Sequence, residues 1–432
     1  TNRGTFNSGG NTTYSALSTV AGSTTTMAGT NTFNGNITNA GTFSGGTGTN
    51  TYARVTNNGT FNGGSGSNTF TTTRFSNSAT GAFDSGTATN NFNVIFNNSN
   101  TATFSGGITN FSAGFTNNDP GTVTATAGIV NFDGTATQTI TNNSTAPTPL
   151  SFYNLNLTGT GSKRLSGSGD FSVGGDLTIN SGVTLTYVNA SNTSSLNVTG
   201  AMTNDGTYTH NSTGTLTVGG TLTNNSGKTM TLGTATTTLN GDLNNAGTIT
   251  QNTGAFDFNG GSFANSGTFT ITSGANTFGG TVFNNTGTFN VGTAPITFDN
   301  AGNTSISTTP ALTFANLNFS GSGTKTLTSG SFAIADTGAL TMAGTTTLAA
   351  GGNLTLNSGA TSTARVAAIP SGAAISGNVN VQRYFTGGGT LPSNIYRSYR
   401  LLSSPVNSNS VTNNNSSTAL YNLAGLSYLY TG

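Results

Sequence analysis

The chain repeats one short motif at a spacing of 20 residues, as Asn245-Ala246-Gly247-Thr248-Ile249, Asn265-Ser266-Gly267-Thr268-Phe269 and Asn285-Thr286-Gly287-Thr288-Phe289. Related copies begin at Asn39, Asn57 and Asn204. Asn and Gly favour tight turns, and apolar residues that alternate with Thr favour a half-buried strand. A fixed period of this length is typical of stacked repeat architectures. Each repeat therefore predicts a turn followed by a short strand.

Aligning the repeats places apolar residues in three columns. In the second half of the chain the columns are Met202, Leu222, Leu243, Phe263, Phe283; Tyr208, Met230, Ile249, Phe269, Phe289; and Val218, Leu239, Phe258, Phe278, Phe298. Toward the N-terminus we expect the same columns, in the same order, as Ile37, Val55, Phe75, Phe96; Phe43, Phe61, Phe83, Phe104; and Phe33, Tyr52, Phe70, Phe92. Three columns indicate three short strands in each coil.

The fold class predicted is all-β, a parallel β-solenoid (β-helix) with about 20 residues per coil and a small β-rich C-terminal cap or module. Inward side chains of successive coils stack about 4.8 Å apart in such a structure. The Asn that precedes each Gly is expected to form a ladder of side-chain amides along the stack. About 17 or 18 coils are expected, and because a coil cannot bury its own apolar face, stability must come from stacking.

Composition supports this fold and excludes several functions. Only 5% of the 432 residues are charged, the net charge is +1, and the chain has 63 Gly and no Cys. Without clustered Lys and Arg it has no electrostatic reason to bind nucleic acid, and without Cys it has no disulfides or thiolate metal sites. No apolar stretch is long enough to span a membrane. The chain begins at Thr1, so we expect a mature or excised segment whose export signal has been removed.

A longer repeat divides the solenoid into two blocks, residues 1–150 and 151–364. Asn154-Leu155-Asn156-Leu157 and the following turn to Lys163 match Asn316-Leu317-Asn318-Phe319 and the turn to Lys325, at an offset of 162 residues, near eight coils. After about residue 364 the 20-residue register is lost and Tyr and Arg become frequent. We therefore interpret residues 365–432 as a cap or assembly module, since an open stack needs an atypical terminal unit.

The two blocks and the tail resemble a known family. Asn154-Leu155-Asn156-Leu157 with its Gly-rich turn, Gly377–Tyr384 and Tyr399–Val406 resemble segments of large secreted repeat proteins of the Bacteroidetes. Members of that group are exported by the type IX secretion system to the outer membrane or beyond. The resemblance implies a secreted, extracellular or cell-surface location and brings no catalytic residues with it. A C-terminal sorting domain typical of the family is not recognisable in this sequence.

Several residues are candidates for functional sites, and each of them also has a structural interpretation. His210 lies in an inward column, where a hydrogen-bonded interior role is commoner than catalysis. Gly167-Ser168-Gly169-Asp170 and Gly174-Gly175-Asp176 are similar to calcium-binding Gly/Asp turns, but the nine-residue period of such sites is missing. Asp205 is expected above Asn225, and Asp257 above Asn276, which gives no paired acids for glycan cleavage. The sequence thus predicts no catalytic residue, no metal and no cofactor.

One outward surface is unusually regular, with Thr207/Thr209, Thr229/Thr231, Thr248/Thr250 and Thr268/Thr270 on successive coils. Such an array resembles the ice-binding face of β-helical antifreeze proteins. Thr is also a favourable polar residue for any solvent-facing strand.

The function predicted is that of a non-enzymatic extracellular structural protein, either a surface rod or a self-assembling filament subunit, with a possible adhesive role. A glycan- or surface-binding adhesin stalk acting as a monomer is the alternative; a polysaccharide-processing β-helix enzyme and an ice-binding protein are more remote. End-to-end self-association is the expected partnership, with cell-surface components or glycans as other partners. The candidate assembly strand comprises Leu420, Tyr421, Leu423, Leu426, Tyr428, Leu429 and Tyr430.

Overall fold

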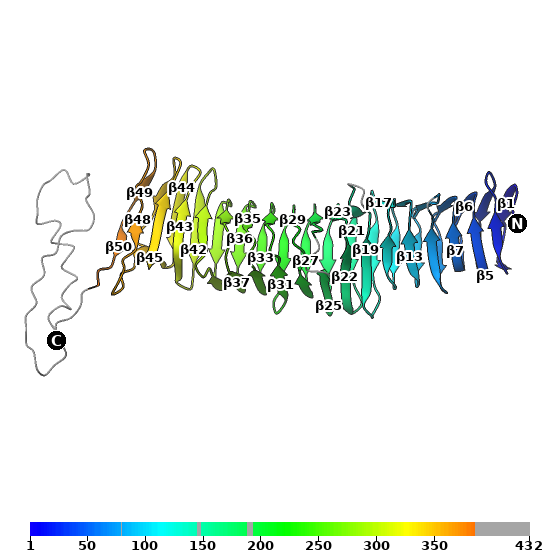
Figure 1. Cartoon of the computed structure of the whole chain (residues 1–432), viewed down its shortest axis with the longest axis horizontal. Helices are drawn as coiled ribbons and strands as arrows, with labels where there is room; N and C mark the ends of the chain where they lie inside the picture. Colours follow the sequence, from blue (N-terminus) through cyan, green and yellow to red (C-terminus); the bar gives the residue numbers. More distant parts are fainter. Residues whose placement is uncertain (79, 145–147, 188–192, 385–432) are drawn as a thin grey trace, which may run out of the picture.

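The computed structural model describes residues 1–78, 80–144, 148–187 and 193–384. These residues form a straight stack of parallel strands with the N-terminal coil at one end, and no helix occurs among them (Figure 1). About 18 turns follow one another, which corresponds to a rod of roughly 85 Å at 4.8 Å per coil. The predicted fold class, a parallel β-solenoid with three short strands per coil, is confirmed.

The stack has three faces, which we number in chain order within a coil. Sheet A forms faces 1 and 2, while sheets B and C form face 3, B in the first block and C in the second. In the last coils sheet C also takes over face 2. Along these strands Thr alternates with apolar residues such as Phe, Val and Leu, so that the apolar side chains point into the rod and Thr points outward.

The strands of face 1 are β2 (Thr12–Tyr14), β9 (Ser67–Phe70), β12 (Thr89–Phe92), β15 (Ile108–Phe111), β18 (Ile129–Phe132), β21 (Asn154–Leu157), β24 (Leu177–Ile179), β27 (Met202–Asn204), β30 (Leu222–Asn224), β33 (Leu243–Asn245), β36 (Ser262–Asn265), β39 (Val282–Asn285), β42 (Thr304–Thr308), β44 (Thr324–Ser329), β46 (Thr347–Ala349) and β49 (Ala374–Ser376). Two long strands run through faces 1 and 2, namely β5 (Thr30–Asn39) and β7 (Thr49–Asn57). The strands of face 2 are β3 (Leu17–Thr19), β10 (Arg74–Asn77), β13 (Ile95–Asn98), β16 (Phe115–Asn117), β19 (Gln138–Asn142), β22 (Gly161–Gly167), β25 (Val183–Tyr187), β28 (Thr207–Thr209), β31 (Thr229–Leu232), β34 (Thr248–Gln251), β37 (Thr268–Ile271) and β40 (Thr288–Asn290).

Sheet B comprises β1 (Thr5–Ser8), β4 (Thr24–Met27), β6 (Thr42–Ser44), β8 (Thr60–Asn62), β11 (Ala82–Asp84), β14 (Thr101–Phe104) and β17 (Thr122–Ala125). Sheet C comprises β20 (Leu150–Phe152), β23 (Phe171–Val173), β26 (Leu196–Val198), β29 (Leu216–Val218), β32 (Thr237–Leu239), β35 (Phe256–Phe258), β38 (Asn276–Phe278), β41 (Pro295–Phe298), β43 (Leu312–Phe319), β45 (Phe332–Met342), β47 (Leu354–Leu356), β48 (Arg365–Val366) and β50 (Val379–Val381).

The interior is filled by stacked rings in the first block. Phe33, Tyr52, Phe70 and Phe92 form one such column, with ring centroids 5.4, 4.9 and 4.3 Å apart along it. Edge-to-face contacts between columns tie them together, as between Phe75 and Phe83 at 5.3 Å. Offset and edge-to-face aromatic pairs add to the burial energy. The core of this block is therefore a continuous aromatic column.

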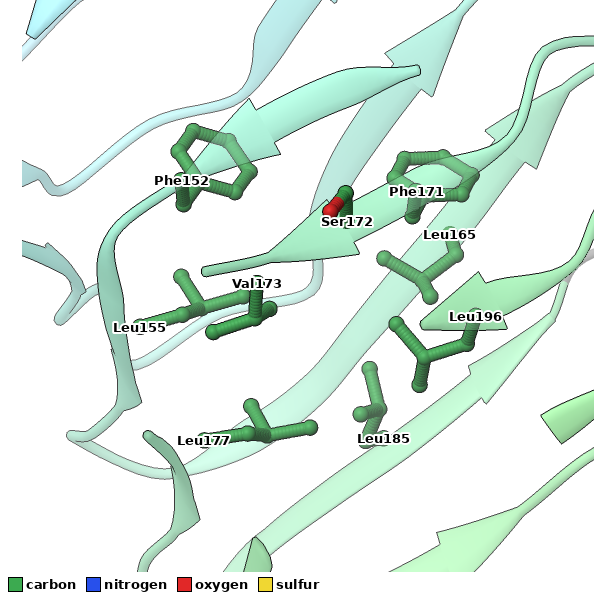
Figure 2. A pocket seen from close by; sticks show the side chains of 9 residues that line it. All are labelled: Phe152, Leu155, Leu165, Phe171, Ser172, Val173, Leu177, Leu185 and Leu196. Carbon is green, nitrogen blue, oxygen red and sulfur yellow. The ribbon is translucent and has the colours of Figure 1, made fainter. Parts of the chain in front are cut away.

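Beyond Phe152 the interior changes to mainly branched aliphatic side chains for several coils, and stacked rings return between Phe256 and Phe319. A small apolar gap lies at this junction, where side chains of β20 to β26 converge (Figure 2). The residues around the gap are Phe152, Leu155, Leu165, Phe171, Ser172, Val173, Leu177, Leu185 and Leu196. Because its lining is apolar apart from the edge at Ser172, the gap is a packing defect and offers no chemistry.

The predicted columns are confirmed within each block, with one exception. The second-half columns pair in the expected register. In the first half Phe83 pairs with Ala102, whereas Phe104 pairs with Ala125. The two-residue shift preserves the inward orientation because strand side chains alternate with a period of two.

The expected order of the columns across the two blocks is wrong. The face-2 column that contains Ile37 and Phe96 continues through Phe115, Ile140 and Leu165 to Tyr187 in β25. Strand β25 pairs with β28, which holds Tyr208, and not with β27, which holds Met202. In the first block the Asn-Gly turn connects face 2 to face 3, as between β5 and β6, whereas in the second block it connects face 1 to face 2, as between β33 and β34. The same turn therefore occupies a different corner in each block.

The 162-residue repeat shows the same rotation. The first copy, in β21, lies on face 1. Strand β42 lies on the same face seven coils further along the rod. The second copy, in β43, follows β42 and lies on face 3, two faces beyond it. The offset is thus seven coils and two faces rather than eight coils. The second block is related to the first by a shift along the rod and a rotation by one face.

The predicted Asn ladder is present, once in each block. In the first block Asn39, Asn57, Asn77, Asn98, Asn117 and Asn142 follow one another, each Nδ2 donating to the next Oδ1 at 2.7–3.0 Å. In the second block the ladder comprises Asn204, Asn224, Asn245, Asn265 and Asn285, with distances of 2.6–2.9 Å. An additional ladder, not anticipated, joins Asn31, Asn50, Asn68 and Asn90. Buried amides paired in this way leave few orphan polar groups inside the rod.

Two boundaries can be compared with the sequence. Face 3 changes from sheet B to sheet C between β17 and β20, close to residue 150, where the sequence separates the blocks. The parallel stack does not stop at residue 364, since β49 pairs with β46 and β50 with β47. These last coils are 25 to 27 residues long, as between Leu354 and Val379 and between Leu348 and Ile375, so the 20-residue period no longer detects them.

Candidate functional site

His210 is a buried interior residue with both ring nitrogens bonded. Nε2 lies 2.8 Å from the carbonyl oxygen of Gly214, which can only accept, so Nε2 carries the proton. Nδ1 then accepts from the hydroxyl of Tyr208 at 2.7 Å. Burial lowers the pKa of His210, and the hydrogen bond to Gly214 acts in the opposite direction. This geometry is that of a neutral, structural histidine.

The lowered pKa predicts a pH-dependent stability. Below about pH 6.5 the unfolded chain binds a proton on His210 more readily than the folded chain, so stability is full above that pH and falls as the pH falls toward the lower folded pKa. For one group the slope is at most about 1.4 kcal/mol per pH unit. His210 is the only histidine, so urea-unfolding midpoints at pH 5 and 8 should differ more in the natural chain than in His210→Gln. Equal differences in both proteins would contradict this assignment.

The aspartates of the two Gly/Asp turns, which are similar to calcium-binding turns, accept backbone hydrogen bonds from the next coil. Asp170 Oδ1 accepts the backbone N–H of Ser195 at 2.8 Å, and Asp176 Oδ1 accepts that of Ala201 at 2.8 Å. Asp242 takes the N–H of Ser262 in the same way. Each carboxylate therefore connects its own coil to the next by a hydrogen bond, and we call these three contacts the Asp staples. No cluster of three metal-ligating residues occurs in the described part of the chain.

The predicted acid neighbours are half correct. Asn225 donates to Asp205 Oδ1, as expected from their stacking. Asp257 pairs with Thr277 instead of Asn276, and Thr277 Oγ1 donates to Asp257 Oδ1 at 2.7 Å. The one-residue difference places Asn276 inside the rod and Thr277 outside. Neither place brings two carboxylates together.

Two buried lysines were not identified from the sequence as special. Lys325 Nζ donates to three carbonyl oxygens, of Asn300, Gly302 and Ser322, at 2.6–2.7 Å. Lys163, its counterpart in the first copy of the long repeat, donates to the carbonyls of Gly134 and Thr160. Burial lowers the pKa of both lysines, while Asp299 acts on Lys325 and Asp133 on Lys163 in the opposite direction. The sequence signal is long-range rather than local, because both copies of the 162-residue repeat end in Lys.

The Thr array lies on face 2 of the second block. One column comprises Thr184, Thr207, Thr229, Thr248, Thr268 and Thr288, and the other comprises Thr186, Thr209, Thr231, Thr250 and Thr270, followed by Asn290. The array therefore begins one coil earlier than the sequence suggested. Arg164 precedes Thr186 in its column, so a charge marks the start of the array.

The candidate assembly strand, Leu420 to Tyr430, lies outside the described residues. The opposite end of the stack is described. There β1 pairs only with β4 and β2 only with β5 among the described strands, so the outer edges of both are without a partner. Phe6 and Tyr14 are only partly buried, and Tyr14 stacks on Phe33 at 4.7 Å. The aromatic column thus reaches the surface at this end.

Comparison with protein-family models, with curated proteins and with solved structures finds no match. Within the described residues no helix is long and apolar enough to cross a membrane.

Proposed function

We propose that the chain is a non-enzymatic extracellular structural protein, a surface rod or a self-assembling filament subunit. The observation that carries this proposal is the continuous parallel stack from Thr5 to Val381 around a filled interior. Polar side chains in this stack mainly join one coil to the next, as the Asn ladders and the Asp staples do. A rod held together in this way is suited to bear load along its axis. Secretion to a bacterial cell surface, in the manner of type IX cargo, fits this role.

End-to-end association follows from the physics of sheet edges. An exposed strand edge is a template for another strand, and a head-to-tail contact between copies gives an open filament. The edges of β1 and β2 carry no charged side chain. We propose the uncharged segment 420–430 of a second copy as their partner by strand addition, because Leu426, Tyr428 and Tyr430 alternate in the sequence as an inward face would.

Negative-stain electron microscopy at rising protein concentration tests the proposal. Uniform filaments that lengthen with concentration are expected, and isolated rods of roughly 85 Å at all concentrations would favour the alternative of a monomeric adhesin stalk. Deleting residues 420–432 should abolish the filaments. Filaments of normal length after the deletion would contradict the role of that segment.

A further inference from the structure

The Thr array forms a two-dimensional grid of side chains. Across the strands the register places Thr under Thr on six coils of the first column, at about 4.8 Å per coil. Along each strand the two columns are two residues apart, about 6.6 Å in a parallel sheet. The successive face-2 strands from β25 to β40 pair with one another without any register shift. The pairings of β42 with β44 and of β43 with β45 each contain a shift. The grid is therefore regular in both directions.

The side chains of this grid are rigid and uncharged. Tyr208, Met230, Ile249 and Phe269 are fully buried between the Thr columns and anchor each strand. A β-branched side chain has few accessible χ1 rotamers, so its hydroxyl and methyl hold fixed positions. At the two ends of the array, Asn211 Nδ2 donates to the hydroxyl of Thr186 and Asn290 Nδ2 donates to that of Thr270. On the four coils from Thr207 to Thr270, no Thr hydroxyl of the array donates to another residue of the described chain.

The other faces of the same block lack such a grid. Each coil shows one outward position on face 3, where Thr217, Thr238, Asp257 and Thr277 follow one another. On face 1 the corresponding column is Thr203, Thr223, Asn244 and Ala264. Neither has an unbroken run of Thr, and the short second column of face 1, Ser262, Val282 and Ser305, contains no Thr. A general preference of strands for Thr therefore does not explain the array.

The spacing of the grid can be compared with that of ordered water. Water oxygens in ice have four tetrahedral neighbours at about 2.75 Å, the usual O–H···O distance. This geometry places second neighbours about 4.5 Å apart and gives a repeat of about 7.3 Å along the hexagonal axis. The grid, at about 4.8 and 6.6 Å, agrees with both spacings to within about a tenth.

We propose that the Thr array on face 2 of the second block binds the surface of ice. Rigid hydroxyl and methyl groups at lattice-like spacing order a layer of water that joins the crystal face, and an uncharged surface does not draw that water into ion hydration shells. The array works on isolated rods and on filaments alike, so this role is independent of the structural function proposed above.

The test is the growth of single ice crystals in solutions of the full-length chain, together with the thermal hysteresis gap. Faceted crystals and a measurable gap are expected for the natural protein. Thr250→Tyr, which places a large side chain at the centre of the array while keeping a good strand former, should reduce the gap at least tenfold. The matched control Thr223→Tyr changes an outward Thr of face 1 and should leave the gap unchanged.

Round, unshaped crystals with the natural protein would overturn the proposal, as would equal gaps in the two variants. Retention of the natural chain on insoluble cellulose, lost in Thr250→Tyr and without any effect on ice, would assign the array to glycan binding and also overturn it. Electron microscopy of the same samples reports on the rod separately, so failure of one proposal does not imply failure of the other.

Discussion

Replacing Lys325 by Met is expected to lower the free energy of unfolding by about 3–5 kcal/mol, the usual effect of breaking a buried charged cluster. All three donors of the ammonium group are used, on the carbonyls of Asn300, Gly302 and Ser322. Met fills a similar volume but donates nothing, so three carbonyls would lose a charged hydrogen-bond donor. Urea unfolding followed by circular dichroism measures the effect.

The control is Lys228→Met, which removes the same charge from a partly exposed turn and should change stability by less than about 0.5 kcal/mol. Burial raises the pKa of Asp299, and the charge of Lys325 opposes that shift. In the Lys325→Met background, Asp299→Asn should therefore restore part of the lost stability. A loss no larger than that of Lys228→Met would show that the carbonyls are satisfied in another way.

The strands and the inward columns were predictable because they depend on local chemistry. Asn-Gly turns and the alternation in Thr268-Phe269-Thr270-Ile271 are readable within one coil, and stacking of identical coils then determines the register. The Asn ladder followed for the same reason, since Asn245 and Asn265 occupy equivalent places in successive coils.

The rotation between the blocks could not be predicted in this way. A turn motif specifies how the chain bends, but it fits any corner of a three-sided coil, so Asn39 and Asn245 look alike although they lie at different corners. Only the chain of pairings through the junction at β19, β22 and β25 reveals the change.

The buried lysines and the extended stack escaped sequence reasoning for other reasons. Lys is usually solvent-exposed, and nothing local distinguishes the buried Lys325 from Lys228. The coils beyond residue 364 keep the alternation, as in Val379-Asn380-Val381, but their greater length breaks the period on which the alignment depended.

Asn245→Leu should lower the free energy of unfolding by about 2–4 kcal/mol, because it interrupts the ladder in the middle of the second block. Asn245 Nδ2 donates to Asn265 Oδ1 at 2.7 Å and to the carbonyl of Thr268 at 2.9 Å, while its Oδ1 accepts from Asn224. Asn224 Nδ2 keeps the carbonyls of Lys228 and Thr248 as acceptors, so Leu removes a needed partner mainly from Asn265 Oδ1 and from the carbonyl of Thr268. A buried group left unsatisfied costs about 1–3 kcal/mol. The neighbouring Asn244 supplies the control, since it is exposed on the same strand and Asn244→Leu should cost less than about 0.5 kcal/mol. If both substitutions cost the same in urea unfolding, the ladder does not stabilise the stack, and its cohesion rests on the apolar columns alone.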